Sequence, residues 1–154
     1  HRADNLLSMR TPSDIQIFQA RAALFMGPRG PWLEHLVQDE GLSFEDAVRA
    51  LVGWELIPYI DTLHGHMATL IKKNREVHLA VFRRFRGKGH INAARIREFF
   101  QPILDKEVFL VTKLAAKDDP RFILHLGFQE LGVTIGDDIT TYILNNIRYP
   151  RAAA

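Results

Sequence analysis

Residues 58–85 constrain the fold more than any other stretch, because between Pro58 and Phe85 only Gly65 interrupts the sequence. Their apolar residues recur at the spacing of one helix face, namely Ile60, Leu63, Met67, Leu70, Ile71, Val77, Val81 and Phe85. This spacing predicts one long helix, loosened at Gly65 and ending at Gly87 and Gly89. No segment shows sustained alternation of apolar and polar residues, so the sequence predicts an all-α fold.

Helix start and stop signals divide the rest of the chain. Thr11 and Pro12 fit the cap and first turn of a helix that ends at Gly27. Ser43 and Asn92 are expected to cap later helices, and further helices are expected over residues 31–40, 119–132 and 137–147. The helix that follows Asn92 is expected to reach Leu114, with Pro102 either kinking it or marking its beginning. The pattern therefore predicts about seven helices with short connections.

A chain of 154 residues suits one domain. We expect residues 1–10 to form an N-terminal extension, residues 11–151 the single helical domain, and residues 152–154 a vector-derived tail. No apolar run approaches the length of about 18 residues that a membrane helix needs. The chain has no cysteine, which excludes disulfides, thiolate metal sites and cysteine nucleophiles. We expect a cytoplasmic location.

Residues 72–97 form a strongly basic segment. They contain nine Lys and Arg against the single acid Glu76, a net charge of +8 in a chain whose overall charge is +2. As a nucleic-acid site, this segment would contact phosphates through its arginines, with Phe82 or Phe85 available to stack on bases. The simpler interpretation is a solvated helix end, where cations interact favourably with the helix dipole. We favour the simpler interpretation, with both phenylalanines in the core.

The sequence contains no hydrolase or kinase motif and no dinucleotide-binding fingerprint. The stretches GPRG and RGKGH combine glycines with basic residues but do not have the spacing of a P-loop. A calcium loop is excluded, because arginine and lysine stand where carboxylate ligands are needed. No nucleophile lies at the spacing of a partner base, so an enzyme is the least favoured class.

The histidines are candidate metal ligands. On a helix, His64 and His66 would point about 200° apart and could not bind one metal together. His78 lies beside the apolar stripe and suits a hydrogen-bonded core histidine, whereas His90 follows the glycines and suits an exposed loop. No spacing among these residues predicts a zinc site.

Three stretches are similar to parts of the globins. TPSDIQIFQARAALF resembles a globin first helix, and AVRALVGWELIPYI resembles the helix that covers the distal side of haem. RGKGHINAARIREFFQPIL resembles the corner and helix that follow the haem-linking histidine. The weak similarity covers about two thirds of the chain and implies a globin-like bundle, although the expected final helix is interrupted at Gly132 and Gly136.

The globin resemblance implies a haem iron bound by His90 or His78, with His90 slightly preferred. If His90 is proximal, His64 or His66 is the distal candidate. Arg83, Arg86 or Lys88 would pair with the propionates, and the apolar lining would come from Phe44, Leu51, Phe82 and Phe99. The implied function is binding or sensing of a diatomic gas such as oxygen.

A second hypothesis belongs to another class of protein. In it, the chain is a non-enzymatic helical interaction module. Its basic segment, residues 72–97, would bind an acidic protein partner, nucleic-acid phosphate or an anionic membrane surface.

Overall fold

The computed structural model describes residue 16 and residues 26–87, 89–134, 136 and 138–146. Six strands form one sheet: β1 (Glu55–Asp61), β2 (Gly65–Lys73), β3 (Glu76–Val81), β4 (Phe109–Ala115), β5 (Gln129–Thr134) and β6 (Ile139–Asn145). The helical elements are α3 (Gly30–Glu34), the π-helix η1 (His35–Asp39), α4 (Phe44–Ala50), the 3₁₀-helix η2 (Arg83–Phe85), α5 (Ala93–Leu104) and α6 (Arg121–His125).

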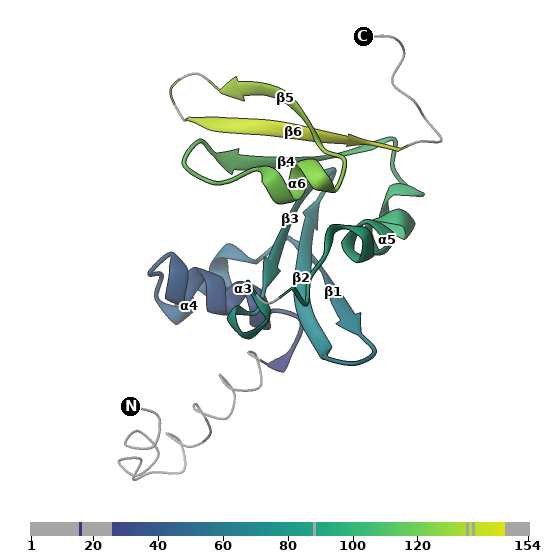
Figure 1. Cartoon of the computed structure of the whole chain (residues 1–154). Coiled ribbons are helices and arrows are strands. Elements are labelled where there is room, and N and C mark those ends of the chain that lie inside the picture. Colours follow the sequence, from purple (N-terminus) through teal and green to yellow (C-terminus); the bar gives the residue numbers. More distant parts are fainter. Residues whose placement is uncertain (1–15, 17–25, 88, 135, 137, 147–154) are drawn as a thin grey trace.

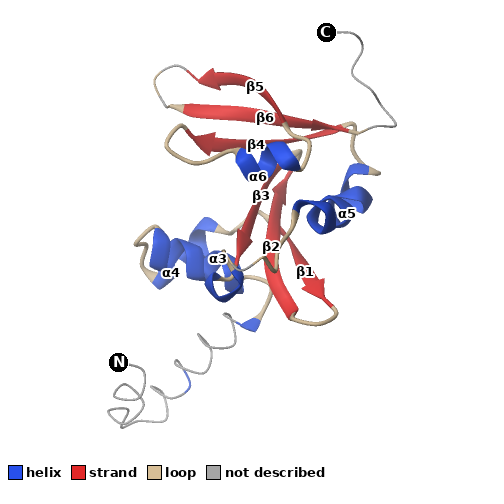
Figure 2. Cartoon of the chain, viewed as in Figure 1, coloured by secondary structure: helices blue, strands red, loops and turns tan. Residues whose placement is uncertain are grey.

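The architecture is a mixed sheet with helices packed on it, so the all-α prediction is wrong (Figure 1, Figure 2). The strand order is β1-β2-β3-β4-β6-β5. A globin has no sheet, and the globin-like bundle is therefore also wrong. Three predicted segments lie outside the described residues. They are the first helix, apart from single positions, the extension over residues 1–10 and the tail over residues 152–154.

The stretch predicted as one long helix forms the three antiparallel strands β1, β2 and β3. The carboxylate of Asp61 accepts hydrogen bonds from the amides of Leu63 and His64, at 2.9 Å each, and so closes the first turn. Gly65 and Asn74 adopt φ values of +75° and +55°, which reverse the chain before β2 and after it. Two local turns therefore break the run, one at Gly65, where only a loosened helix was predicted, and one at Asn74, where no break was predicted.

The burial of β2 explains why no alternation is visible. Residues 67–71 are all buried, because the strand lies inside the sheet with helices on both faces. A short run of continuously apolar residues fits a doubly covered strand and a helix equally well. Strand β6 also lacks visible alternation, because residues 142–144 are all buried. A last helix was predicted there.

Two hydrophobic clusters lie on opposite faces of the sheet. Leu70 belongs to the cluster that holds Phe100 of α5, whereas Ile71 belongs to the cluster that holds Leu33 of α3. Because successive strand residues point to opposite faces, α5 and the pair α3 and α4 cover different sides.

The predicted caps agree with the structure in two places. The hydroxyl of Ser43 accepts a hydrogen bond from the amide of Asp46 at 3.1 Å. The side chain of Asn92 accepts one from the amide of Arg95 at 2.9 Å. The helix that Asn92 begins ends at Leu104, however, and the remainder of its predicted length forms β4. In the part of the chain that the structure describes, no helix is long and apolar enough to cross a membrane.

Strands β3 and β4 are parallel neighbours that share a single registered pair, Glu76 with Val111. Beyond this pair the two strands run apart, β3 alongside β2 and β4 alongside β6 (Figure 1). The sheet is therefore divided into two antiparallel halves that meet at one point, and the space between them forms the site described next.

Candidate functional site

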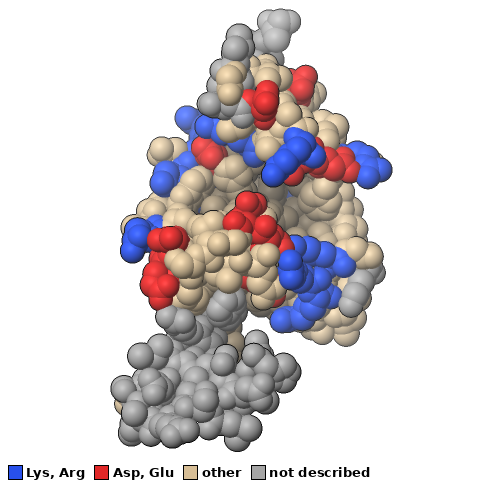
Figure 3. Space-filling view, turned by 90° about the vertical axis from the view of Figure 1, so that its left-hand side faces the viewer, with Lys and Arg blue, Asp and Glu red and all other residues tan. Residues whose placement is uncertain are grey.

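A cavity of about 820 Å³ lies where β3 and β4 separate. Apolar side chains form much of its wall, among them Leu79, Val81, Phe100, Leu114, Leu126 and Phe128. The polar residues at its edge include Trp32, His35, Glu40, His78, Arg86 and Asp118. Figure 3 views the molecule from the side on which the strands diverge, with basic and acidic residues around the hollow. An apolar cleft with a few convergent polar groups is the usual form of a ligand site.

One end of the cavity is closed by the turn between β3 and α5. Gly87 and Gly89 line the cavity there with φ values of +70° and +72°, a conformation that side chains disfavour. Among the described residues, none accepts a hydrogen bond from the backbone amides of these two glycines. The turn leads into the N-terminus of α5, where Asn92 is the cap. Free amides beside a helix N-terminus favour an anionic ligand.

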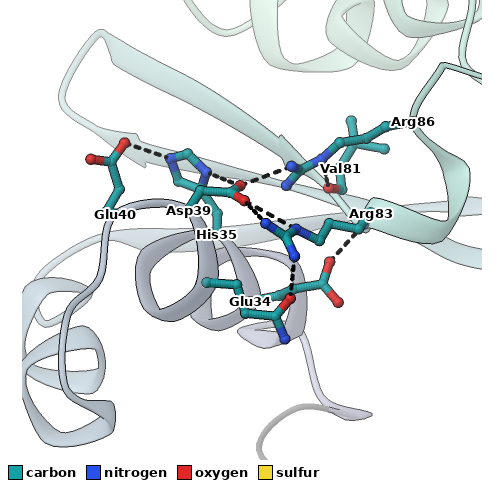
Figure 4. Close-up of polar contacts among 8 residues, drawn as sticks. Glu34, His35, Asp39, Glu40, Val81, Arg83 and Arg86 are labelled. Carbon is teal, nitrogen blue, oxygen red and sulfur yellow. Dashed lines mark hydrogen bonds and ion pairs between the residues drawn. The ribbon is translucent and has the colours of Figure 1, made fainter.

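Asp39 of the π-helix η1 forms hydrogen bonds with two arginines that follow β3 (Figure 4). Its carboxylate accepts hydrogen bonds from Arg83 at 2.6 Å and from Arg86 at 2.8 Å. It also pairs with His35 Nδ1 at 2.8 Å. Burial alone would raise the pKa of Asp39, but the hydrogen bonds from His35, Arg86 and Arg83 outweigh it and hold the pKa well below its ordinary value.

Arg86 is held in one orientation by two partners. Its Nε donates to the backbone carbonyl of Val81 at 2.8 Å, while its Nη1 donates to Asp39. The Glu34 carboxylate accepts a hydrogen bond from the Arg83 amide at 2.6 Å, which joins α3 to the same turn. The guanidinium that lines the cavity is therefore preorganised.

His78 and Glu76 form a second polar group, near the point where the strands separate. His78 Nε2 lies 2.6 Å from Glu76 Oε2, and His78 Nδ1 lies 3.5 Å from the Thr112 hydroxyl on β4. Burial raises the pKa of Glu76, but the hydrogen bond and charge of His78, together with Lys113, outweigh it and leave the pKa below its ordinary value. Glu76 is therefore a carboxylate at neutral pH.

The other histidines considered as metal ligands lie in two different places. His64 and His90 are brought together, with ring centroids 4.7 Å apart and Phe85 beside both. His66 Nε2 lies 2.8 Å from the hydroxyl of Thr69. Within the described residues, no group of three or more His, Cys, Asp or Glu side chains could hold a metal ion.

The residues expected to line a haem pocket do not form one pocket. Leu51 and Phe44 pack in the cluster with α3, whereas Phe99 packs in the cluster on the other face of the sheet. Phe82 is buried, with 6% of its surface exposed, as its assignment to the core implied. The prediction of haem with a gaseous ligand is wrong, because the sheet leaves no globin pocket for these side chains.

The basic segment is also not the surface of one helix. Residues 72–97 are distributed over β2, β3, the turn and α5, so their charges face different directions. Arg83 and Arg86 pair with Asp39, Arg95 pairs with Asp61, and Lys72 pairs with Glu107. These ion pairs replace the free cationic face that the helical interaction module required. Its acidic protein, nucleic-acid and membrane partners are therefore not supported.

Comparison with known proteins shows which of them share this fold. No family model matches the sequence, and no curated protein matches it. A mutant spermidine N-acetyltransferase from Vibrio cholerae is similar in structure, with a TM-score of 0.55 and 14% identity over 85% of this chain and 94% of that one. An acetyltransferase from Agrobacterium tumefaciens C58 gives a TM-score of 0.53 and 8% identity over 75% and 83% of the two chains. The chain has the fold of these acetyltransferases. At such low identity the likeness extends to the fold alone.

Within this acetyltransferase fold, the site feature that sequence reasoning missed is the glycine turn. Its signal is a strand followed by two glycines and then a capped helix, in the order EVHLAV, RGKG, Asn92. With residues 76–81 assigned to a helix, the same glycines indicate only a break between two helices. With those residues identified as a strand, the glycines indicate an anion-binding turn.

Proposed function

We propose that the chain is an acyltransferase that moves an acyl group from a coenzyme A thioester to an amine. The observation that carries the proposal is the cavity between β3 and β4, closed at one end by the Gly87–Gly89 turn and Arg86. The fold shared with two acetyltransferases supports it, one of them a spermidine N-acetyltransferase.

The turn suits the diphosphate of coenzyme A. The backbone amides of Gly87 and Gly89 would donate hydrogen bonds to phosphate oxygens, and the N-terminus of α5 adds a positive potential. Arg86 would add a charge-assisted hydrogen bond, because its planar guanidinium matches phosphate geometry and Asp39 already fixes its orientation. Neither glycine has a side chain that would block such a ligand. Both adopt a positive φ, which residues with a side chain disfavour.

The separated strands suit the amide-containing arm of the same molecule. Because β3 and β4 share one residue pair, their facing edges beyond it carry backbone groups that an extended ligand can bind. The wall behind these edges is mainly apolar, which suits the methylene groups of the arm. The arm would then lie along the cavity, from the glycine turn toward the Glu76–Val111 pair.

Coenzyme A supplies an acyl group activated as a thioester. The residues of this chain would bind it, exclude water and orient the amine toward the acyl carbon. Glu40 and Asp118 line the cavity, and their negative charges favour a cationic acceptor such as a primary amine.

Calorimetry with acetyl-CoA tests the binding step. We expect saturable binding of one molecule per chain, weakened about tenfold or more in Arg86→Ala, since a hydrogen bond between charged groups is worth about 1.5–3 kcal/mol. Arg49→Ala is the matched control, because the Arg49 side chain is 76% exposed and pairs with Asp46 on α4. Release of free thiol from acetyl-CoA in the presence of spermidine tests transfer. Absence of acetyl-CoA binding by the wild-type chain would contradict the proposal.

A further inference from the structure

We infer that His78 is the general base that takes a proton from the acceptor amine, and that Glu76 positions it. This inference rests on the proposed acyl transfer and adds to it a catalytic residue. Four observations support it: the position of His78 in the cavity, the tautomer that its partner imposes, its aromatic and charged neighbours, and the carboxylate partners of the other cavity histidine.

His78 lies close to the point where the strands separate. Glu76 forms the single residue pair with Val111, and His78 is two residues further along β3. At about 3.3 Å per strand residue, this places His78 about 7 Å beyond the pair. The same rise puts it about 10 Å before Val81, whose carbonyl accepts a hydrogen bond from Arg86. A thioester whose diphosphate lies at the glycine turn would therefore extend along β3 toward His78.

The partner of His78 determines which ring nitrogen is basic. An ionised carboxylate only accepts hydrogen bonds, so Nε2 must carry the hydrogen that it donates to Glu76 Oε2 over 2.6 Å. In the neutral ring the lone pair then lies on Nδ1. Among the described residues, the one hydrogen-bond partner of Nδ1 is the Thr112 hydroxyl at 3.5 Å, which is too distant for a strong hydrogen bond. Nδ1 is therefore available to accept a proton from an amine.

The ring is fixed by aromatic neighbours. The rings of Trp32 and Trp54 meet it edge to face, with centroids 6.5 Å and 5.7 Å away. Trp32 is itself anchored by a hydrogen bond of 2.8 Å from Nε1 to the carbonyl of Thr69. A base that is held in place before the substrate arrives loses less entropy in the reaction.

The charged groups around His78 come from several parts of the fold. Glu76 lies on its own strand, and Lys113 on β4 pairs with Glu76 Oε1 at 3.5 Å. His35 of η1 and Glu40, which follows it, line the same cavity. Arg86 and Asp118 line it as well, so the protonation of all these groups bears on the pH dependence of a reaction at His78.

Both ring nitrogens of the second histidine on the cavity wall lie near carboxylates. His35 Nδ1 pairs with Asp39 at 2.8 Å, and His35 Nε2 lies 3.5 Å from Glu40. Of the two described histidines that line the cavity, each has a partner at 3.5 Å from its second nitrogen, but that partner is the Glu40 carboxylate for His35 and the Thr112 hydroxyl for His78. This difference selects His78 rather than His35.

The reaction balances with one proton released. The amine enters as an ammonium ion, and His78 Nδ1 takes its first proton. The amine nitrogen forms a bond to the acyl carbon while the bond between that carbon and sulfur breaks. The second amine proton ends on the departing thiolate, which leaves as the thiol of coenzyme A. His78 returns its proton to water, and no oxidation or reduction occurs.

His78→Gln tests the assignment with acetyl-CoA and spermidine as substrates. Glutamine keeps a hydrogen-bond donor toward Glu76 but is not a base, so we expect kcat/KM to fall about 10²–10⁴-fold. Acetyl-CoA affinity should stay within about twofold, which also shows that the variant is folded. His125→Gln is the matched control, because His125 is exposed and absent from the cavity wall. His78→Asn provides a second variant should His78→Gln lose its fold.

The pH profile separates a base from a structural residue. In His78→Gln the reaction depends on amine that is already neutral, so its rate should rise about tenfold per pH unit toward the pKa near 10 of a primary amine. The wild type should instead reach a plateau at lower pH. In Glu76→Gln, kcat should fall while KM for acetyl-CoA stays constant, and Glu76→Asp should recover part of kcat.

The outcomes distinguish the two proposals. If His78→Gln retains kcat/KM within about threefold of a catalytically active wild type and has the same pH profile, His78 is not the base. In that case the acyltransferase function stands. If the wild-type chain binds no acetyl-CoA, or binds it and acetylates neither spermidine nor peptide amines, the proposed function itself fails.

Discussion

Replacing Gly87 with alanine separates the cost of backbone strain from a loss of ligand binding. Gly87 adopts a φ of +70°, and a Cβ added there would meet no described atom within 4 Å. The stability cost is therefore the strain of the left-handed conformation, about 1–2 kcal/mol for a residue with a Cβ. For a domain of this size, that loss lowers the melting temperature by about 2–8 °C.

Binding of acetyl-CoA should fall by more than strain explains. Gly87 lines the cavity, so the added methyl group would stand where the proposed diphosphate meets the turn. Loss of one charge-assisted hydrogen bond, about 1.5–3 kcal/mol, corresponds to about 10–150-fold in affinity. Calorimetry with acetyl-CoA measures this change directly.

Gly65→Ala is the matched control for this prediction. Gly65 has a φ of +75° and equally open surroundings, but it lies in the β1–β2 turn and not on the cavity wall. We expect both variants to lose similar stability and only Gly87→Ala to lose affinity. Equal affinity in the two variants would refute the assignment of the turn as the phosphate site.

Three further predictions concern stability. Asp39→Asn should lower the free energy of unfolding at neutral pH by about 1.5 kcal/mol, the low end for charged hydrogen bonds because the side chain is 21% exposed. Because the folded pKa of Asp39 is lowered, this stabilisation is present above about pH 4 and is lost as pH falls toward the folded pKa. The free energies of urea unfolding of wild type and variant should therefore converge in acid. Asn146→Ala should cost about 2–4 kcal/mol in urea unfolding, because buried Asn146 donates to the carbonyls of Leu104 and Glu107. Ser43→Ala should cost about 1 kcal/mol through loss of the α4 cap, and an unchanged melting temperature would contradict that role.

Local signals in the sequence predicted local structure well. Ser43 and Asn92 cap helices as their residue types indicate, because a cap depends on atoms within three residues. The assignment of Phe82 to the core also agrees with its burial. Each of these inferences needed only the chemistry of neighbouring positions.

The sheet could not be predicted from periodicity. The residues of β2 from Met67 to Ile71 are buried whichever face they point to, so the alternation that marks a strand is missing. The turn at Asn74 depends on a positive φ that asparagine tolerates without the glycine or proline that marks most breaks. Helical spacing of apolar residues then arose by coincidence in a segment that folds into strands and turns.

The site could not be predicted because its parts are distant in sequence. The cavity depends on the single Glu76–Val111 pair between β3 and β4, and the orientation of Arg86 depends on Asp39, 47 positions earlier. Neither contact leaves a local pattern. The sequence indicates a hydrogen-bonded core histidine at His78, and its hydrogen bond to Glu76 fits that description, but the adjoining cavity is invisible from the sequence.

Backbone amide signals provide the most direct test of the central claim that the β3–α5 turn binds the diphosphate of an acyl-CoA. A nitrogen–proton correlation spectrum, recorded during titration with acetyl-CoA, follows the amides of Gly87 and Gly89 individually. We expect both signals to shift and to saturate together with the calorimetric binding curve, while the signal of Gly65 stays in place. Saturable binding of acetyl-CoA that leaves the Gly87 and Gly89 signals unmoved would contradict the claim.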